Sequence, residues 1–186
     1  ISPQVGVFLL ISIGLRLGVF PLHLPFTVET NVRRGQGTLL RMAPAASALV
    51  VLSRLPSTTV APGFEIWLSI FAALALMYSS IRWLIEKDEL LARPYWIISL
   101  SASAIICVLT GSPFLSLSWG ISLIFLSSAL FLFDSYNRFM RILAWIGLIN
   151  LAGLPFTANS SGIQALAAEG HIYWIIPAFI ALLFLI

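Results

Sequence analysis

Long apolar stretches alternate along this chain with short polar, charged or proline-containing stretches. Most of the apolar stretches are longer than a strand and approach the ~20 apolar residues that a membrane-spanning helix needs. We therefore predict an all-α fold, a polytopic transmembrane bundle of about seven helices that forms a single domain over residues 1–186. The predicted helices are 5–20 (continuing irregularly to Phe26), 38–55, 63–85, 94–110, 113–133, 137–154 and 171–186.

Prolines predict interruptions in several of these helices. The segment Phe20-Pro21-Leu22-His23-Leu24-Pro25 predicts that the first helix is broken at Pro21–Pro25, because proline lacks a backbone N–H and clashes with the preceding turn. The same argument predicts a break at Pro44, and at the Gly153-Leu154-Pro155 end of the sixth helix. Gly14 and Gly18 form a Gly-x-x-x-Gly pattern that is typical of a small-residue packing face between helices.

The composition supports lipid as the solvent of most side chains. Hydrophobic residues make up 60% of the chain and charged residues 9%, whereas soluble domains carry about 25% charged residues. A catalytic soluble domain is therefore excluded. The formal net charge of +3 is small and its carriers are scattered, so we predict no nucleic-acid partner. Membrane lipid is the expected partner of the outer surface.

The basic residues predict an orientation. When the loops are assigned alternately to two sides, seven Lys or Arg residues fall on one side and one on the other. The seven are Arg33, Arg34, Arg82, Lys87, Arg93, Arg138 and Arg141, and the one is Arg54. The positive-inside rule then makes loops 27–37, 86–93 and 134–138 cytoplasmic, and loops 56–62, 111–113 and 155–170 external. We expect an integral protein of a prokaryotic cytoplasmic membrane, or of a thylakoid or organellar inner membrane.

Three ionisable residues near the helix breaks are the candidate functional residues. Arg16 and Arg41 lie inside predicted spans, where a charge is expensive and is often functional. His23 lies at the predicted break, just after Pro21, and its ordinary pKa near neutrality suits a proton relay. We predict that these residues supply a proton path or a buried charge. The alternatives are arginines whose long side chains reach the interface, and a histidine that bonds loose carbonyl groups.

Motifs for bound cofactors or catalysis are missing from the sequence. It contains one cysteine, Cys107, and two histidines, so an internal disulfide and a cysteine metal cluster are excluded. We find no phosphate-binding loop, dinucleotide fingerprint, zinc-protease motif or nucleophile elbow. We expect no catalytic residue, cofactor or metal in this chain.

The segment around Arg16 resembles a family signature. Residues Leu15–Pro25, with Arg16, Pro21 and His23, look like the broken-helix motif of the antiporter-like membrane subunits of respiratory complex I and of the Mrp antiporters. Three further stretches keep the order of that family over about residues 10–165: Thr38–Leu55 ending in Arg54-Leu55, Asp88–Ser103, and Leu148–Gly162 with Gly153-Leu154-Pro155. Arg16 stands where the family has a lysine. Because the chain begins at Ile1 and ends inside an apolar run, we expect a divergent part of an antiporter-like fold.

The resemblance implies a membrane subunit of a proton-translocating, quinone-linked complex similar to NADH dehydrogenase. Quinone and the redox centres would lie in partner subunits, so this chain would be at most a non-redox subunit of an oxidoreductase. Other membrane subunits are then its expected partners. Two alternatives are a degenerate structural subunit without transport and a stand-alone cation/proton antiporter. The segment 94–133 carries few titratable groups, which favours the first two of these three readings over the third.

Overall fold

The structure is a computed structural model that describes residues 3–22, 34–56, 62–132, 138–152 and 154–168. Within these ranges the chain is all-α, with seven α-helices and one short 3₁₀ helix. They are α1 (Pro3–Leu17), α2 (Arg34–Ser53), α3 (Pro62–Ile85), α4 (Glu89–Leu109), η1 (Pro113–Leu115), α5 (Ser116–Phe131), α6 (Arg138–Leu151) and α7 (Ala158–Ala168). The all-α prediction is confirmed.

Helix α4 begins earlier than the sequence pattern predicts. Its N-cap is Asp88, whose side chain accepts a hydrogen bond of 2.9 Å from the backbone N–H of Leu90. This cap satisfies one of the unpaired N–H groups at a helix start, so the helix forms from Glu89 and contains Pro94. The prediction that 86–93 is entirely a loop is therefore wrong, since its second half is helical.

The last helix in the described residues is also different from the prediction. Residues 155–170 were expected to form an external loop, but Ala158–Ala168 form α7. Four of its eleven residues are alanine, which has the highest helix propensity, so it forms a helix without the long apolar run that the prediction required. The predicted helix 171–186 lies outside the described residues.

A glycine ends helix α1. Gly18 has a φ of 77°, and its N–H bonds the carbonyl of Leu15 while the N–H of Val19 bonds the carbonyl of Gly14 at 2.8 Å. This is the Schellman arrangement, in which a left-handed glycine closes the last turn. The helix therefore stops at Leu17, before Pro21, and glycine rather than proline terminates it. Pro25 lies outside the described residues.

Gly14 serves the same turn. After Gly18 the chain folds back, and a Cβ atom built on Gly14 would overlap the ring of Phe20. Phe20 and Val19 are buried there. The Gly-x-x-x-Gly pattern thus forms a local helix end, and the structure gives no support to an interhelical packing face at Gly14.

The predicted break at Pro44 is wrong. Helix α2 runs without interruption from Arg34 to Ser53, with Pro44 inside it. Proline removes one backbone hydrogen bond, and the rest of this 20-residue helix continues on both sides of it. A proline in a long helix is tolerated where neighbouring groups compensate for the lost bond.

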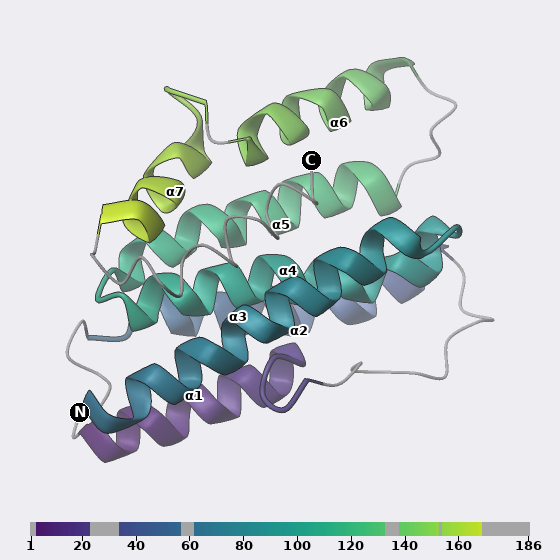
Figure 1. The fold of residues 1–186 in the computed structure, drawn as a ribbon. Coiled ribbons are helices and arrows are strands. Elements are labelled where there is room, and N and C mark those ends of the chain that lie inside the picture. Colours follow the sequence, from purple (N-terminus) through teal and green to yellow (C-terminus); the bar gives the residue numbers. More distant parts are fainter. Residues whose placement is uncertain (1–2, 23–33, 57–61, 133–137, 153, 169–186) are drawn as a thin grey trace.

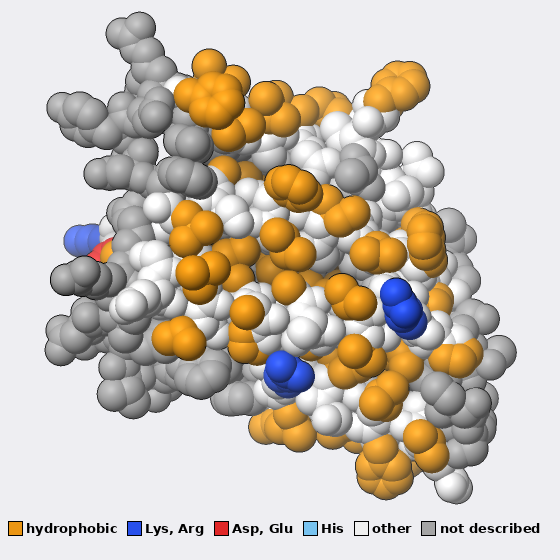
Figure 2. All heavy atoms as spheres, turned by 180° about the vertical axis from the view of Figure 1, so that it is seen from behind, with side chains coloured by type: hydrophobic (Ala, Val, Ile, Leu, Met, Phe, Trp, Pro, Cys, Tyr) orange, Lys and Arg blue, Asp and Glu red, His pale blue; other side chains and the backbone are white. Residues whose placement is uncertain are grey.

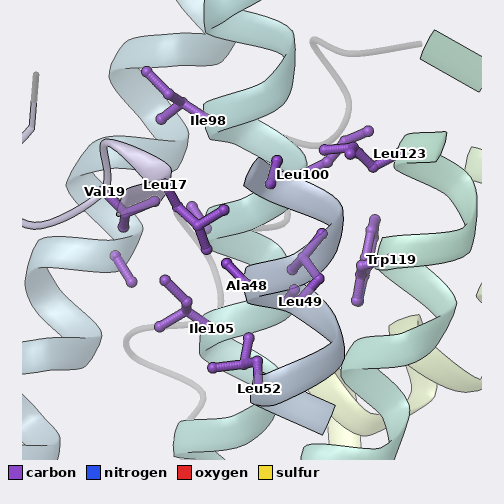
Figure 3. Packing of buried hydrophobic residues seen from close by; sticks show 14 of the residues in the cluster. Leu17, Val19, Ala48, Leu49, Leu52, Ile98, Leu100, Ile105, Trp119 and Leu123 are labelled. Atoms are coloured by element: carbon purple, nitrogen blue, oxygen red, sulfur yellow. The ribbon is translucent and has the colours of Figure 1, made fainter. Parts of the chain in front are cut away.

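Helix α4 is the centre of the bundle. Figure 1 shows α1 to α6 running roughly alongside one another, with α1 and α6 at opposite edges. Of the most apolar stretch of α4, 94% is buried, against 39% for α3 and 50% for the α5 segment. Side chains from several helices meet around α4 (Figure 3), among them Leu17, Ala48, Leu49, Leu52, Ile98, Leu100, Ile105, Trp119 and Leu123.

Contacts show which helix ends lie together. Arg93 at the start of α4 bonds Thr38 at the start of α2. Trp83 near the end of α3 packs on Phe131 at the end of α5, with their ring centroids 6.0 Å apart. The start of α2, the α3–α4 turn and the end of α5 therefore lie at one end of the bundle.

Three helical segments in the described part of the chain are long and apolar enough to cross a membrane: Gly63–Ile85, Leu90–Leu109 and Pro113–Phe131. Gln4–Leu17 is apolar but shorter. The surface is apolar as well (Figure 2), with hydrophobic side chains spread over the face shown and few charged ones among them. Large exposed side chains follow α3 at helical spacing: Phe64, Trp67, Phe71, Leu74, Tyr78, Ile81 and Ile85.

Replacing Gly14 by alanine tests the turn that ends α1. We expect Gly14→Ala to lower the free energy of unfolding by about 1–3 kcal/mol, because its Cβ displaces the ring of Phe20. Unfolding would be measured by denaturant titration in detergent micelles. Gly35→Ala is the matched control, since a Cβ there meets nothing within 4 Å. The double variant Gly14→Ala/Phe20→Ala should lose less than the sum of the single losses; strict additivity would contradict the proposed contact.

Candidate functional site

The structure brings two of the predicted site residues together. Arg16, in the last turn of α1, and Arg41, in α2, line the same narrow cavity of about 20 Å³. Its other walls are Leu17, Pro44, Ala45, Pro94 and Ile97, so α1, α2 and α4 all contribute. His23 lies outside the described residues. Of the predicted helix-break residues, Pro21 and Pro155 are exposed, and Gly153 lies outside the described residues.

Neither arginine is a fully buried charge. In the single chain Arg16 is exposed and Arg41 is half-buried. The physical reason is the early end of α1. Its last turn lies at the edge of the bundle, where a basic side chain is favoured by the negative end of the helix dipole.

The buried charge is Arg93, the last residue of the predicted loop 86–93. Its side chain is 3% exposed, and its Nη1 donates a hydrogen bond of 2.7 Å to Oγ1 of Thr38. A Cβ on Gly37 would lie 3.0 Å from the guanidinium group. Glycine at position 37 therefore leaves the room that the arginine occupies. Among the described residues, Arg93 is the one charged side chain in the buried set.

A second arginine, Arg82 near the end of α3, lies at the same end of the bundle. Nη2 of Arg82 is 3.3 Å from Oε2 of Glu86 and 3.2 Å from the hydroxyl oxygen of Tyr95. The guanidinium carbon lies 5.2 Å from the centre of the Tyr95 ring, a distance at which cation–π attraction is favourable. The guanidinium group of Arg82, near the α3–α4 turn, is thus held by Glu86 and Tyr95.

The interior between the helix ends carries neutral polar groups. The hydroxyl oxygens of Ser79 and Ser99 are 2.9 Å apart, which joins α3 to α4. Nε1 of Trp96 donates a bond of 3.0 Å to Ser127, which joins α4 to α5. Hydroxyl and indole groups do not exchange a proton readily near neutral pH. In the part of the chain that the structure describes, these contacts fix helix positions and form no chain of titratable groups.

At the opposite end of the bundle, small residues and the side-chain amide of Asn150 allow contacts between the helices. Nε1 of Trp119 donates to Sγ of Cys107 at 3.2 Å, and a Cβ on Gly162 would overlap Oγ of Ser118. Nδ2 of Asn150 donates a bond of 2.8 Å to Ser122. Helix α7 therefore packs closely on α5, and α6 is tied to α5 by one amide.

A groove of about 590 Å³ lies between α5 and α6. Its walls are mostly apolar, with Phe125, Leu126 and Ile146 among them. Asn150, Ser122 and Thr157 provide polar groups. The described residues contain no group of three metal-ligating side chains.

Comparison with known proteins gives no relative for this chain: no family model, curated protein or solved structure matches it. The class of protein therefore follows from the fold and from the contacts of its arginines. They define a protein that is all-α in its described residues, with membrane-length apolar helices and with Arg82 and Arg93 at one end of the bundle.

The Arg93–Thr38 bond can be tested with a double-mutant cycle. We expect a coupling of about 1.5–3 kcal/mol between Arg93→Met and Thr38→Val, because hydrogen bonds to charged groups fall in this range. Unfolding in detergent would be followed by the reaction of a fluorogenic maleimide with Cys107, the single cysteine, which is buried. Arg54→Met, at an exposed arginine, should change stability little. A coupling near zero would show that the bond contributes nothing to the α2–α4 packing.

Proposed function

We propose that this chain is an integral membrane subunit of a proton-translocating, quinone-linked complex similar to NADH dehydrogenase, and that it scaffolds or contributes to the proton path. The observation that carries the membrane assignment is the apolar exterior. Phe64, Trp67 and Phe71 of α3 are each more than half exposed. Exposed apolar surface of this extent is costly in water and expected in lipid.

The arrangement of charge supports the orientation. Lys87 and the Arg82–Glu86 pair lie at the α3–α4 turn, and Arg93 joins the starts of α2 and α4 at the same end. We assign this end to the cytoplasmic side of a prokaryotic cytoplasmic membrane or its organellar equivalent. The external side then receives the turn at Gly111 and the start of α5.

The likeness of Leu15–Pro25 and Asp88–Ser103 to antiporter-like subunits supports the assignment to a complex of this class. Such a subunit binds no redox centre itself, and quinone and the electron carriers belong to its partners. The neutral interior of α4, with Ser99 and Ser103 bonded within the bundle, favours a scaffolding role over a complete proton wire.

The same neutral interior favours, as second candidate, a structural subunit that fills a place in such a complex without transport. The two candidates differ in the consequence of losing the chain. Loss of a subunit that contributes to the proton path lowers the number of protons moved per electron. Loss of a structural subunit lowers the amount of assembled complex.

Membrane orientation can be measured with single cysteines. On a Cys107→Ala background, we expect Lys87→Cys to react with a membrane-impermeant maleimide in inverted vesicles, and Phe114→Cys to react in right-side-out vesicles. Both positions are exposed, and they lie at opposite ends of α4 and its flanking turns. The Cys107→Ala chain contains no cysteine, so it is the control and should not react with the maleimide. Labelling of both positions from one side would overturn the proposed bundle orientation.

The function is tested by isolating the tagged chain from native membranes in mild detergent. We expect it to remain in the membrane after carbonate washing and to purify with redox subunits that reduce quinone. Removing the chain should lower the number of protons that inverted vesicles take up per electron, whereas a loss of assembled complex at an unchanged ratio would favour the structural subunit. A chain that purifies alone and exchanges cations for protons in liposomes would instead be a stand-alone antiporter.

A further inference from the structure

The groove between α5 and α6 has apolar walls on both sides. Phe125 of α5 and Leu143 and Ile146 of α6 line it, and all three side chains are exposed. None of the described residues that line the groove is charged. Helix α6 lies at the edge of the bundle (Figure 1), so the groove opens toward whatever surrounds the bundle.

Two hydrogen-bond donors on the groove wall have no acceptor within the described part of the chain. Nδ2 of Asn150 carries two hydrogens and donates one of them to Oγ of Ser122. Ser122 accepts this bond, and its own hydroxyl hydrogen has no acceptor among the described residues. The side chain of Asn159 supplies none, although its backbone N–H bonds Oδ1 of Asn150. The hydroxyls of Ser128 and Thr157, by contrast, donate to carbonyl groups of their own segments.

These two donors lie halfway along the bundle. Ser122 lies nine residues after Pro113 and nine residues before Phe131, which are the ends of the membrane-length segment that contains it. Nine helical residues rise about 14 Å, so in a hydrocarbon layer about 30 Å thick Ser122 lies near the middle. The headgroups and ester groups of lipids lie at the surfaces of this layer, and acyl chains contain no acceptor. A donor at this depth is costly unless a protein group bonds it.

We propose that the groove between α5 and α6 receives a transmembrane helix of a partner subunit, and that a hydroxyl or amide side chain halfway along that helix accepts hydrogen bonds from Asn150 and Ser122. Serine, threonine, asparagine and glutamine form such bonds between helices in membranes. The uncharged walls match a partner helix that is otherwise apolar on this face. The inference rests on the proposed function and deepens it, because it assigns the surface on which a partner docks.

The test is site-specific photo-cross-linking of the tagged full chain in native membranes. The photoreactive residue p-benzoylphenylalanine replaces Phe125 in the groove or, as a control, Phe71 on the outer face of α3; both phenylalanines are more than half exposed. We expect position 125 to cross-link to an apolar segment of another protein. Sequencing of the cross-linked peptide by mass spectrometry should find serine, threonine, asparagine or glutamine near the middle of that segment. Position 71 should not give this product.

Filling the groove provides a matched pair of variants. Ile146 lines the groove and Ile142, one turn earlier on α6, does not, although they are 56% and 57% exposed. We expect Ile146→Trp to lower the cross-link yield at position 125 about fivefold, and Ile142→Trp to leave it unchanged. The reactivity of Cys107 shows whether Ile146→Trp is folded. If it is not, Leu143→Phe narrows the same groove and provides the test.

Several results would overturn the proposal: cross-links to lipid alone, to a second copy of this chain or to a segment without a polar side chain near its middle, the same product from position 71, or a yield that the filling variants leave unchanged. A partner that has the polar side chain but belongs to no quinone-reducing complex supports this inference and refutes the proposed function. A chain that purifies with quinone-reducing subunits, but cross-links only to lipid from position 125, refutes this inference alone.

Discussion

The burial of α4 on all sides constrains the rest of the bundle. A helix in this position cannot use water or lipid to satisfy its polar side chains, so Ser99 and Ser103 bond backbone carbonyls of α4 or a neighbouring helix, whereas the buried hydroxyl of Ser101 has no hydrogen-bond partner among the described residues. Ser103 bonds the carbonyl of Ser99, and Ser99 lies within bonding distance of Ser79 on α3. Small serine side chains let α3 approach α4 closely while also bonding to it. The neighbours of α4 are therefore fixed by packing and by hydrogen bonds together.

The two ends of α4 are held by different means. At its start, large groups fill the space: Trp83 and Trp96 lie with ring centroids 4.8 Å apart, and the guanidinium of Arg93 occupies the space beside Gly37. At its end, Gly111 closes the helix with a φ of 78°, and Trp119 bonds Cys107 beside Gly162. Aromatic and charged contacts thus anchor the basic end, whereas close helix approach anchors the other.

The sequence pattern predicts that the long helices exist, but it predicts neither where they end nor that Arg93 is buried. The length of an apolar run predicts that α3 and α5 exist, because burial of such a run needs a helix in either lipid or a core. Helix ends depend on capping contacts such as Asp88 to Leu90 and Val19 to Gly14, which the run length does not describe. The burial of Arg93 depends on the pairing of α2 with α4, a contact over 55 positions that no local pattern contains.

The glycine turn that ends α1 sets the direction of the chain that follows. Gly18 has a φ of 77°, a backbone conformation that residues with a side chain rarely adopt. A residue other than glycine at position 18 would favour continuation of the helix, and Val19 and Phe20 would then leave the buried positions that they take up by folding back beside Gly14. The path of the backbone after α1 therefore depends on the absence of a single Cβ atom.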